Sequence, residues 1–242
     1  MKFAYSMLLV GLAACGGGGG GGGGPDGSVG PDSPPPPATL TISGTASSIG
    51  LSGTTPQAGV AITVYKASDD SVIGTATSDA AGAYSITATT SGSAIDGYLK
   101  ATKTGFKDTY LYPPAPLSAD FAGAPVLLLD SSTWNNVNSL LLGETQAAGN
   151  GWVALIVVDN ITAQTPIMGA TVTTTPAGKI HYNGSQGLPQ AQATSTAADG
   201  IAYSVNVAAG DVTVNAAKSG LTFKSHTIKA RADQITMTLV TE

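Results

Sequence analysis

Three groups of residues recur in the same order in the two halves of this 242-residue chain. Each half has a Pro-x-x-Gly entry to an apolar alternating segment, then an Asp-Gly turn before a tyrosine, then a Lys-x-Gly group. The matching ranges are 56–64 with 166–174, 79–86 with 199–205, and 103–106 with 218–221. Self-similarity of this kind indicates repeated structural units. The sequence therefore predicts two copies of one fold.

Alternating apolar residues indicate what that fold is. Val60, Ile62 and Val64 alternate with smaller or polar residues in the first half, and the segment from Val212 to Ala216 does so in the second. A period of two places one side of a strand against a core. Short segments of this type, separated by turn signals, are typical of an all-β sandwich.

Each half also has an aspartate and a glycine just ahead of a strand that carries a tyrosine. An aspartate in such a turn can accept hydrogen bonds from the main chain that follows it, and glycine tolerates a positive φ. We therefore expect structural turns at equivalent places in the two halves. Their residues are Asp79, Gly82 and Tyr84 in the first half, and Asp199, Gly200 and Tyr203 in the second.

These features resemble the carboxypeptidase regulatory-like, or transthyretin-like, domain, whose signature reads P-x-x-G-A-x-V and then T-x-D-x-x-G-x-Y. The resemblance implies two tandem seven-stranded antiparallel sandwiches, of transthyretin-like or Ig-like type, over residues 39–130 and 151–242. It implies little about function. The second half departs from the signature, because Asp199 and Gly200 are adjacent and an insertion from Pro176 to Gln192 precedes them.

Residues 131–150 connect the two predicted sandwiches. Thr133 could cap a short helix over Trp134 to Leu142, and Gly143 could end it. One interpretation is a helix that packs between the sandwiches, and the other is a helix that binds a partner.

The N-terminal residues Leu12-Ala13-Ala14-Cys15 resemble a bacterial lipobox. The apolar run from Phe3 to Ala14 is shorter than the roughly 20 residues that cross a bilayer. We therefore expect a lipoprotein signal peptide over residues 1–14 and lipid attachment at Cys15, the only cysteine. Gly16 after the cysteine favours the outer membrane under the sorting rule of enteric bacteria.

Residues 15–38 are rich in glycine and proline and include the run Pro34 to Pro37. Glycine loses the most backbone entropy on ordering, and proline runs favour an extended chain. We expect a disordered, lipid-anchored tether, with a span of roughly 25 to 30 Å as a coil.

Composition excludes some function classes. The formal net charge is −5 and the basic residues are scattered, which argues against nucleic-acid binding. His181 and His226 are the only histidines, no two lie at a zinc-ligand spacing, and no Gly-x-Ser-x-Gly motif is present. We therefore expect no catalytic residues, no metal site and no cofactor. His226 alternates like a strand residue and is expected on a solvated face.

Two clusters could form a ligand surface. His181, Tyr182 and Asn183 lie in the insertion of the second half, where an aromatic ring and polar groups could contact a polysaccharide or a protein. The alternative is hairpin packing, with Asn183-Gly184 as the turn. Tyr110, Tyr112 and the Pro113-Pro114 pair form the other cluster, for which the alternative is a seam between the two sandwiches.

The sequence as a whole favours a non-catalytic binding or structural protein, anchored to a membrane by lipid and facing the periplasm or the cell surface. Two alternatives remain open. The chain could be a carbohydrate-binding module, or an accessory subunit that positions a separate secreted hydrolase.

Overall fold

The computed structural model describes residues 37–50 and 53–242. The predicted signal peptide, Cys15 and nearly all of the predicted tether lie outside these residues. No helix in the described part is long and apolar enough to cross a membrane. The described residues form β-sheets with one short helical segment, so the prediction of an all-β sandwich protein is confirmed.

The first half contains eight strands. Their bounds are β1 (Thr39–Gly50), β2 (Gly53–Pro56), β3 (Ala61–Lys66), β4 (Val72–Thr77), β5 (Ala83–Thr89), β6 (Gly97–Thr102), β7 (Thr109–Tyr112) and β8 (Phe121–Leu128). The second half contains β9 (Asn150–Val158), β10 (Thr171–Thr175), β11 (Lys179–Asn183), β12 (Pro189–Gln190), β13 (Ile201–Ala208), β14 (Gly210–Ala217), β15 (His226–Ala230) and β16 (Ile235–Thr241).

The two halves repeat the same strand pairing. In the first, β1 pairs with β5 antiparallel and with β8 parallel. In the second, β9 pairs with β13 antiparallel and with β16 parallel. The three strands β10, β14 and β15 form a sheet of their own, as the equivalents of β3, β6 and β7.

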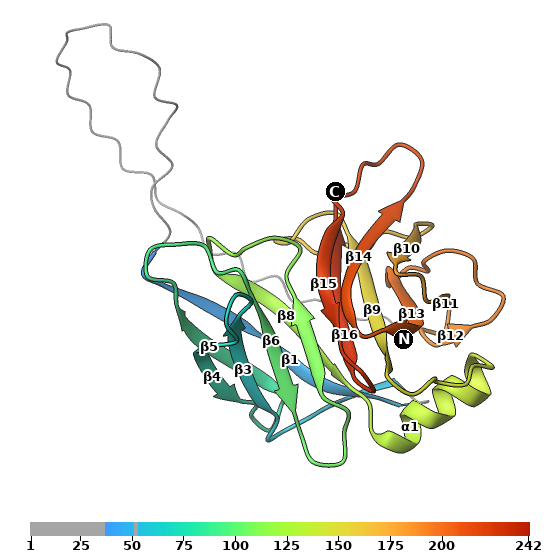
Figure 1. Cartoon of the computed structure of the whole chain (residues 1–242), viewed down its shortest axis with the longest axis horizontal. Helices are drawn as coiled ribbons and strands as arrows, with labels where there is room; N and C mark the ends of the chain where they lie inside the picture. The colour runs from blue at the N-terminus through green and yellow to red at the C-terminus, as the bar shows by residue number, and fades with distance from the viewer. Residues whose placement is uncertain (1–36, 51–52) are drawn as a thin grey trace, which may run out of the picture. The chain divides into compact units, whose positions relative to one another are not determined.

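One sheet runs through both halves. Its order is β12-β11-β13-β9-β16-β7-β6-β3-β4, and it is joined where β16 of the second half pairs in parallel with β7 of the first. The register runs from Ile235 opposite Thr109 to Thr238 opposite Tyr112. Figure 1 shows the red C-terminal strands beside the green strands of the first half. The sequence did not predict this shared sheet.

The shared sheet has a hydrophobic core on each face. Trp152, Ala154 and Val158 of β9 join the core that also contains the first half, whereas Val153, Leu155 and Val157 face the sheet of β10, β14 and β15. Because both faces of β9 are covered, its sequence from Trp152 to Val158 is a continuous apolar run instead of an alternating one.

The helical connection differs from its prediction at the cap. Helix α1 (Ser131–Asn136) begins after Asp130, whose carboxylate accepts hydrogen bonds from the main-chain N–H groups of Ser132 and Thr133. Hydrogen bonds from both hydroxyls and both amides lower the pKa of Asp130 to about 2. Thr133, the predicted cap, therefore lies inside the helix. A π-helical segment, η1 (Val137–Leu141), follows, and Gly143 comes just after it with φ of 64°.

Helix α1 packs between the two halves. The ring of Trp134 stacks on that of Trp152 in β9, with 4.6 Å between centroids, and both side chains are buried. This contact fits the packing interpretation of the connecting helix.

The two Asp-Gly turns make the same contacts. Asp79 Oδ1 accepts from the N–H of Ala83 at 2.9 Å, and Asp199 Oδ1 accepts from the N–H of Ile201 at 3.1 Å. Gly82 and Gly200 have φ of 76° and 68°. A Cβ atom at these positions would lie 2.4 Å from the oxygen of Ala46 and 2.5 Å from that of Val157, respectively. Glycine is therefore required for space as well as for φ.

A buried hydroxyl repeats in the same way, and the sequence comparison missed it. Ser78 donates to the carbonyl of Gln57 and accepts from the N–H of Val60, at 2.6 and 2.9 Å. Thr196 has the same two partners in the second half, Ile167 and Ala170, at 2.7 and 2.9 Å. Both residues carry a hydroxyl and precede the Asp-Gly turn, so the equivalence was visible in principle. It was missed because one residue is serine and the other threonine, and because their distances from the turn along the chain differ.

Candidate functional site

The outer face of the shared sheet carries a group of four tyrosines at the join between the halves. Alternate residues of β3, β6 and β7 point to this face, whereas their neighbours Leu99 and Leu111 point into the core. We call this group, with the arginine that covers it, the tyrosine seam. Its members are Tyr65, Tyr98, Tyr110, Tyr112 and Arg231.

The rings of the tyrosine seam are in contact with one another. Tyr98 stacks on Tyr65 on one side and on Tyr112 on the other, with centroids 5.3 and 5.2 Å apart. Tyr98 and Tyr110 are only 6% and 8% exposed. Most ring faces therefore contact protein, which leaves little aromatic surface on which a sugar ring could stack.

Arg231 connects the second half to this group. It follows β15, and its guanidinium carbon lies 4.6 Å from the ring centroid of Tyr110 and 5.1 Å from that of Tyr98. A guanidinium over an aromatic face is attracted by the electrons of the ring. Tyr110 and Tyr112 therefore lie at a seam between the two halves, which was the alternative to a ligand surface.

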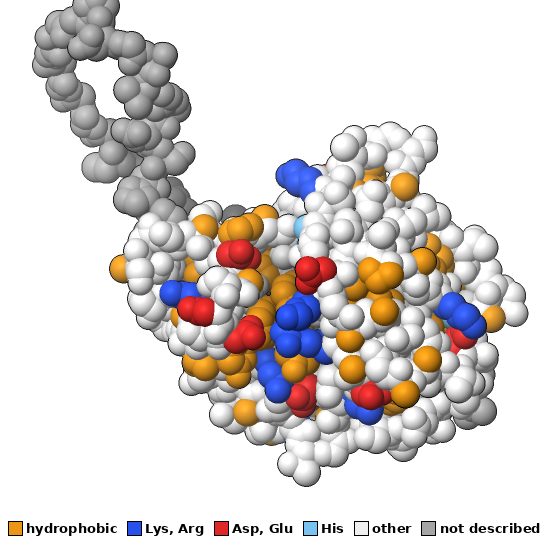
Figure 2. All heavy atoms as spheres, in the orientation of Figure 1, with side chains coloured by type: hydrophobic (Ala, Val, Ile, Leu, Met, Phe, Trp, Pro, Cys, Tyr) orange, Lys and Arg blue, Asp and Glu red, His pale blue; other side chains and the backbone are white. Residues whose placement is uncertain are grey.

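Charged groups surround the tyrosine seam. Lys100 forms an ion pair with Asp108 at 2.9 Å, and the hydroxyl of Tyr98 donates to Asp70 at 2.7 Å. Burial, and then the bond to Asp70, raises the pKa of Tyr98 to about 12, so this hydroxyl remains a donor at neutral pH. Figure 2 shows basic side chains gathered on this face, where the strands of the two halves meet, with acidic ones around them.

Replacing Arg231 by alanine should lower the free energy of unfolding by about 1–2 kcal/mol, because two cation–π contacts between the halves are lost. Chemical denaturation followed by circular dichroism measures the change. Arg231→Lys is the matched control, since it keeps the charge but loses the planar guanidinium. Its free energy of unfolding should lie between those of the parent and of Arg231→Ala. Equal stability of Arg231→Ala and the parent would show that the contact is not a stabilising one.

The structure places His181, Tyr182 and Asn183 in β11, a strand of the shared sheet between β13 and β12. Tyr182 is 6% exposed, and its hydroxyl accepts from the main-chain N–H of Val172 at 3.0 Å. Asn183 is 2% exposed and donates to Asp199 at 2.7 Å. His181 Nε2 lies 3.5 Å from Glu144 Oε1. Tyr182 and Asn183 thus contact other residues of the second half, and His181 contacts the segment that connects the halves; packing of this kind was the alternative to a ligand site.

The strand that follows β10 in the second half, β11, has a different pairing partner from its counterpart β4 in the first half. In the first half, β4 pairs with β3. In the second half, β11 instead pairs with β13, on the opposite sheet, and leaves β10 at an edge. Tyr182 then covers that edge through its bond to Val172.

His226 is partly buried, in contrast to the solvated position expected from the sequence. Its Nε2 lies 2.7 Å from the hydroxyl of Thr238 in β16. The side chain faces β16 because β15 and β16 lie next to each other at this edge of the second half. Burial lowers the pKa of His226.

This lowered pKa gives a pH dependence. The folded state binds the proton of His226 less tightly than the unfolded state does. The contribution of His226 to the free energy of unfolding is therefore complete above the usual histidine pKa of about 6.5, and it is lost as the pH falls below that value. Between about pH 7.5 and about pH 5.5, His226→Gln should therefore lose less stability than the parent. Thermal unfolding at the two pH values measures this, and parallel losses in both proteins would contradict it.

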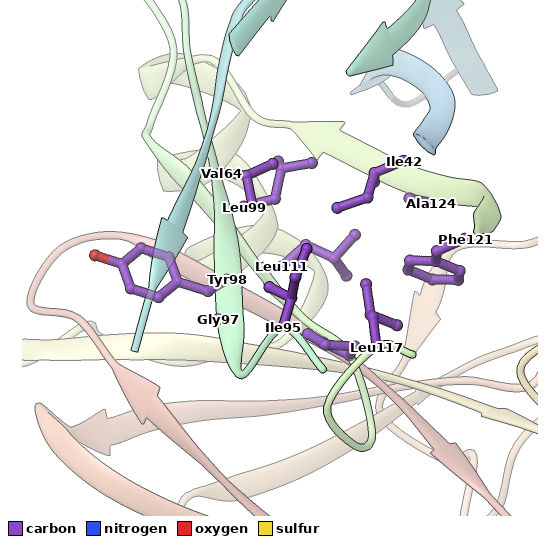
Figure 3. A pocket seen from close by; sticks show the side chains of 11 residues that line it. Ile42, Val64, Ile95, Gly97, Tyr98, Leu99, Leu111, Leu117, Phe121 and Ala124 are labelled. Atoms are coloured by element: carbon purple, nitrogen blue, oxygen red, sulfur yellow. The ribbon is translucent and has the colours of Figure 1, made fainter. Parts of the chain in front are cut away.

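The cavity in the core of the first half is too small for a ligand. Its volume is about 20 Å³, and its lining comes from strands β1, β3, β6, β7 and β8 and the loops beside them. Figure 3 shows the aliphatic side chains converging on it while the hydroxyl of Tyr98 points away. A space of this size with an apolar lining holds about one water molecule at most.

A larger groove lies between the segment that precedes β8 and the loop after β9. Its volume is about 360 Å³, and its lining includes Pro114, Phe121, Asn160, Ile161 and Lys224. In the described part of the chain, no three histidine, cysteine, aspartate or glutamate residues are grouped as metal ligands would be.

No protein-family model and no curated protein matches the chain. Among solved structures, the chain is similar to the TIE protein of Bacillus anthracis, at 13% identity over 84% of this chain and 34% of the other, with a TM-score of 0.28. A streptococcal ancillary pilin has 12% identity, with 85% and 62% covered and a TM-score of 0.26. The minor pilin GBS52 of Streptococcus agalactiae has 13% identity, with 85% and 96% covered and a TM-score of 0.28.

The chain thus spans about a third of the first of these proteins and less than two thirds of the second. With TM-scores below 0.3, these likenesses add nothing to the sandwich fold that the strand pairing of the chain itself shows.

Proposed function

We propose that this chain is a non-catalytic structural protein that holds one rigid two-repeat body at a membrane surface. The pairing of β7 with β16 carries the proposal, because it makes the two repeats parts of one sheet. Helix α1 and Arg231 add contacts between the halves. A pair of repeats joined in this way is suited to act as a spacer or a scaffold, since the repeats cannot swing about a linker.

The proposed rigidity can be tested by small-angle X-ray scattering on the soluble protein. We expect the scattering curve to be described by a single rigid body, without any motion of one half relative to the other. Ile235→Pro, at the start of β16, should weaken the join, because it removes the main-chain N–H that donates to the carbonyl of Asp108, just before β7. Scattering from the parent that requires an ensemble of separated halves would contradict the proposal.

Membrane attachment is proposed to occur through a lipid on Cys15, with residues 1–14 removed and the outer membrane as the destination. Support comes from the residues before Cys15 and from the glycine-rich residues after it. Cys15→Ser should release the protein into the soluble fraction and remove the acyl mass from its N-terminus. Cell fractionation and mass spectrometry measure both. A Ser variant that stays with the membranes, beside a parent that carries no acyl group, would contradict the proposal.

Binding of a polysaccharide or a protein is a second candidate function. The groove lined by Pro114, Phe121 and Asn160 favours it, because apolar and amide groups line one hollow of ligand size. A glycan array on the soluble protein tests this candidate, with Asn160→Ala and Phe121→Ala as variants. Co-purification of a hydrolase would instead favour the role of an accessory subunit.

A further inference from the structure

Arg231 is the only arginine among the ten lysine and arginine residues of the chain. An arginine differs from a lysine in its planar guanidinium, which stacks on aromatic rings and offers paired N–H groups to the two oxygens of a carboxylate. The first property is used within the protein, because the guanidinium lies over the rings of Tyr98 and Tyr110. The second property requires an anionic partner.

None of the described residues supplies that partner. The pairs of basic and acidic side chains in this part of the chain join other residues: Lys100 with Asp108, Lys179 with Glu144, and His181 with Glu144. The carboxylate of Asp70, at the edge of the tyrosine seam, accepts from the hydroxyl of Tyr98 instead. The guanidinium donates from Nη2 to the hydroxyl of Tyr112 at 3.5 Å, longer than an ordinary hydrogen bond, and its Nε is buried without an acceptor. The charge of Arg231 is therefore not balanced by contact with a carboxylate.

The guanidinium is held in position without a ligand. It is half-buried, and it rests on ring faces that come from two neighbouring strands, β6 and β7. A group fixed in this way loses little conformational freedom when it binds. The hydroxyl of Tyr112 lies beside it, and a phenol hydroxyl can donate a hydrogen bond as well as accept one. Since Arg231 comes from the second half and the tyrosines from the first, the site exists only when the two halves are joined.

Charge favours a carboxylate over a phosphate as the anion. Lys100, whose amine lies 5.5 Å from the ring centroid of Tyr110, is already paired with Asp108 at 2.9 Å. A carboxylate brings one negative charge to match that of Arg231, whereas a phosphate monoester carries about −1.5 to −2. The rest of the molecule repels the larger charge more strongly, because the chain has a net charge of −5.

We propose that Arg231 and the tyrosine seam bind a carboxylate of an acidic polysaccharide. A uronic acid unit carries hydroxyl groups beside its carboxylate, which match the phenol hydroxyl of Tyr112 beside the guanidinium. The seam lies on the outer face of a sheet, which supports an extended polymer better than it encloses the side chain of an acidic peptide. The proposal rests on polysaccharide binding, the second candidate function, but none of the residues that line the groove at Phe121 belongs to the seam.

Polygalacturonate is the probe, and its methyl-esterified form is the uncharged reference. Biolayer interferometry of the soluble protein should show binding to the first, and at least tenfold weaker binding to the second and at high salt. Arg231→Gln should weaken binding to polygalacturonate at least tenfold. Lys229→Gln is the matched control, because it removes the same charge from an exposed position in β15 and should change the affinity less than twofold.

Three results would overturn the proposal. One is a parent that does not bind polygalacturonate at low salt, and another is an equal loss of binding in Arg231→Gln and Lys229→Gln. Polyglutamate that binds as tightly as polygalacturonate would overturn the assignment to a polysaccharide. A loss in Asn160→Ala that exceeds the loss in Arg231→Gln would instead place the ligand in the groove, which leaves the second candidate function intact and this site refuted.

Chemical modification tests the same site without a substitution, so it does not depend on the folding of Arg231→Gln. Phenylglyoxal modifies guanidinium groups, and Arg231 carries the only one in the chain, so the added mass reports this residue alone. Polygalacturonate should slow the modification several-fold, while its methyl ester should leave the rate unchanged. Equal rates with and without polygalacturonate would contradict the proposal.

Discussion

Replacing Trp152 by alanine should lower the free energy of unfolding by about 3–5 kcal/mol, the range for a large side chain removed from a core. Trp152 is 1% exposed and contacts both halves of the protein. Its ring stacks on Trp134 and meets the edge of Tyr203, with centroids 4.6 and 6.0 Å apart. The cavity would therefore open where α1 and β9 meet.

Trp152→Phe is the matched control. It keeps an aromatic ring but loses the indole N–H, which lies 3.2 Å from the side-chain oxygens of Asn138 and Gln146. We expect it to cost about 1–3 kcal/mol, since these acceptors would be left buried without a donor. Denaturation followed by far-UV circular dichroism measures both variants. A loss below about 1 kcal/mol for Trp152→Ala would show that the site collapses around the smaller side chain.

Deleting Lys179 to Gly187 should unfold the second half, or lower its unfolding temperature by more than 10 °C, which corresponds to several kcal/mol in a chain of this size. The deletion removes β11 from between β13 and β12, and it removes the hydroxyl of Tyr182 that covers Val172. Far-UV circular dichroism and calorimetry measure the loss.

Tyr182→Phe is the conservative companion to this deletion and should cost about 1 kcal/mol, through loss of one hydrogen bond to the main chain of β10. An unchanged melting transition in the deletion, together with lost binding to a polysaccharide or a surface, would contradict the packing role. It would instead favour a ligand site at His181, Tyr182 and Asn183.

The sequence predicted the local features of the fold well. The alternation of Val60, Ile62 and Val64 predicts a strand with one buried side, and the two even-numbered neighbours Ile62 and Val64 are buried within β3. The Asp-Gly pattern marks both turns because a positive φ and the absence of a Cβ atom are requirements of single residues. Such requirements are visible in one sequence.

Other features depend on partners that are distant in the chain. The pairing of Thr109 with Ile235 joins residues from opposite halves, and nothing in either short strand specifies the other as its neighbour. Tyr182 could equally have stacked on a ligand, and only the position of Val172 shows what its hydroxyl contacts. The role of Arg231 could not be predicted from the sequence, because Arg231 lies outside the repeated groups and contacts tyrosines of the other half.

The helix cap is a smaller example. Thr133 and Asp130 are both capping residue types, and the sequence alone does not show which one has the extended backbone that a cap needs. Asp130 has φ of −67° and ψ of 158°, so the helix begins one turn earlier than predicted.

The position of β16 has a consequence for the order in which the protein folds. Strand β16 is the last strand described, and it lies between β9 and β7, in contact with both halves. During synthesis, β7 can therefore form an edge of the first half long before its partner exists, and that edge stays open until residues 235–241 have been made. The newly made first half then resembles an unprotected sheet, which is the state most prone to wrong strand pairing. Pairing of β16 with β7 closes this edge and joins the two halves into one body.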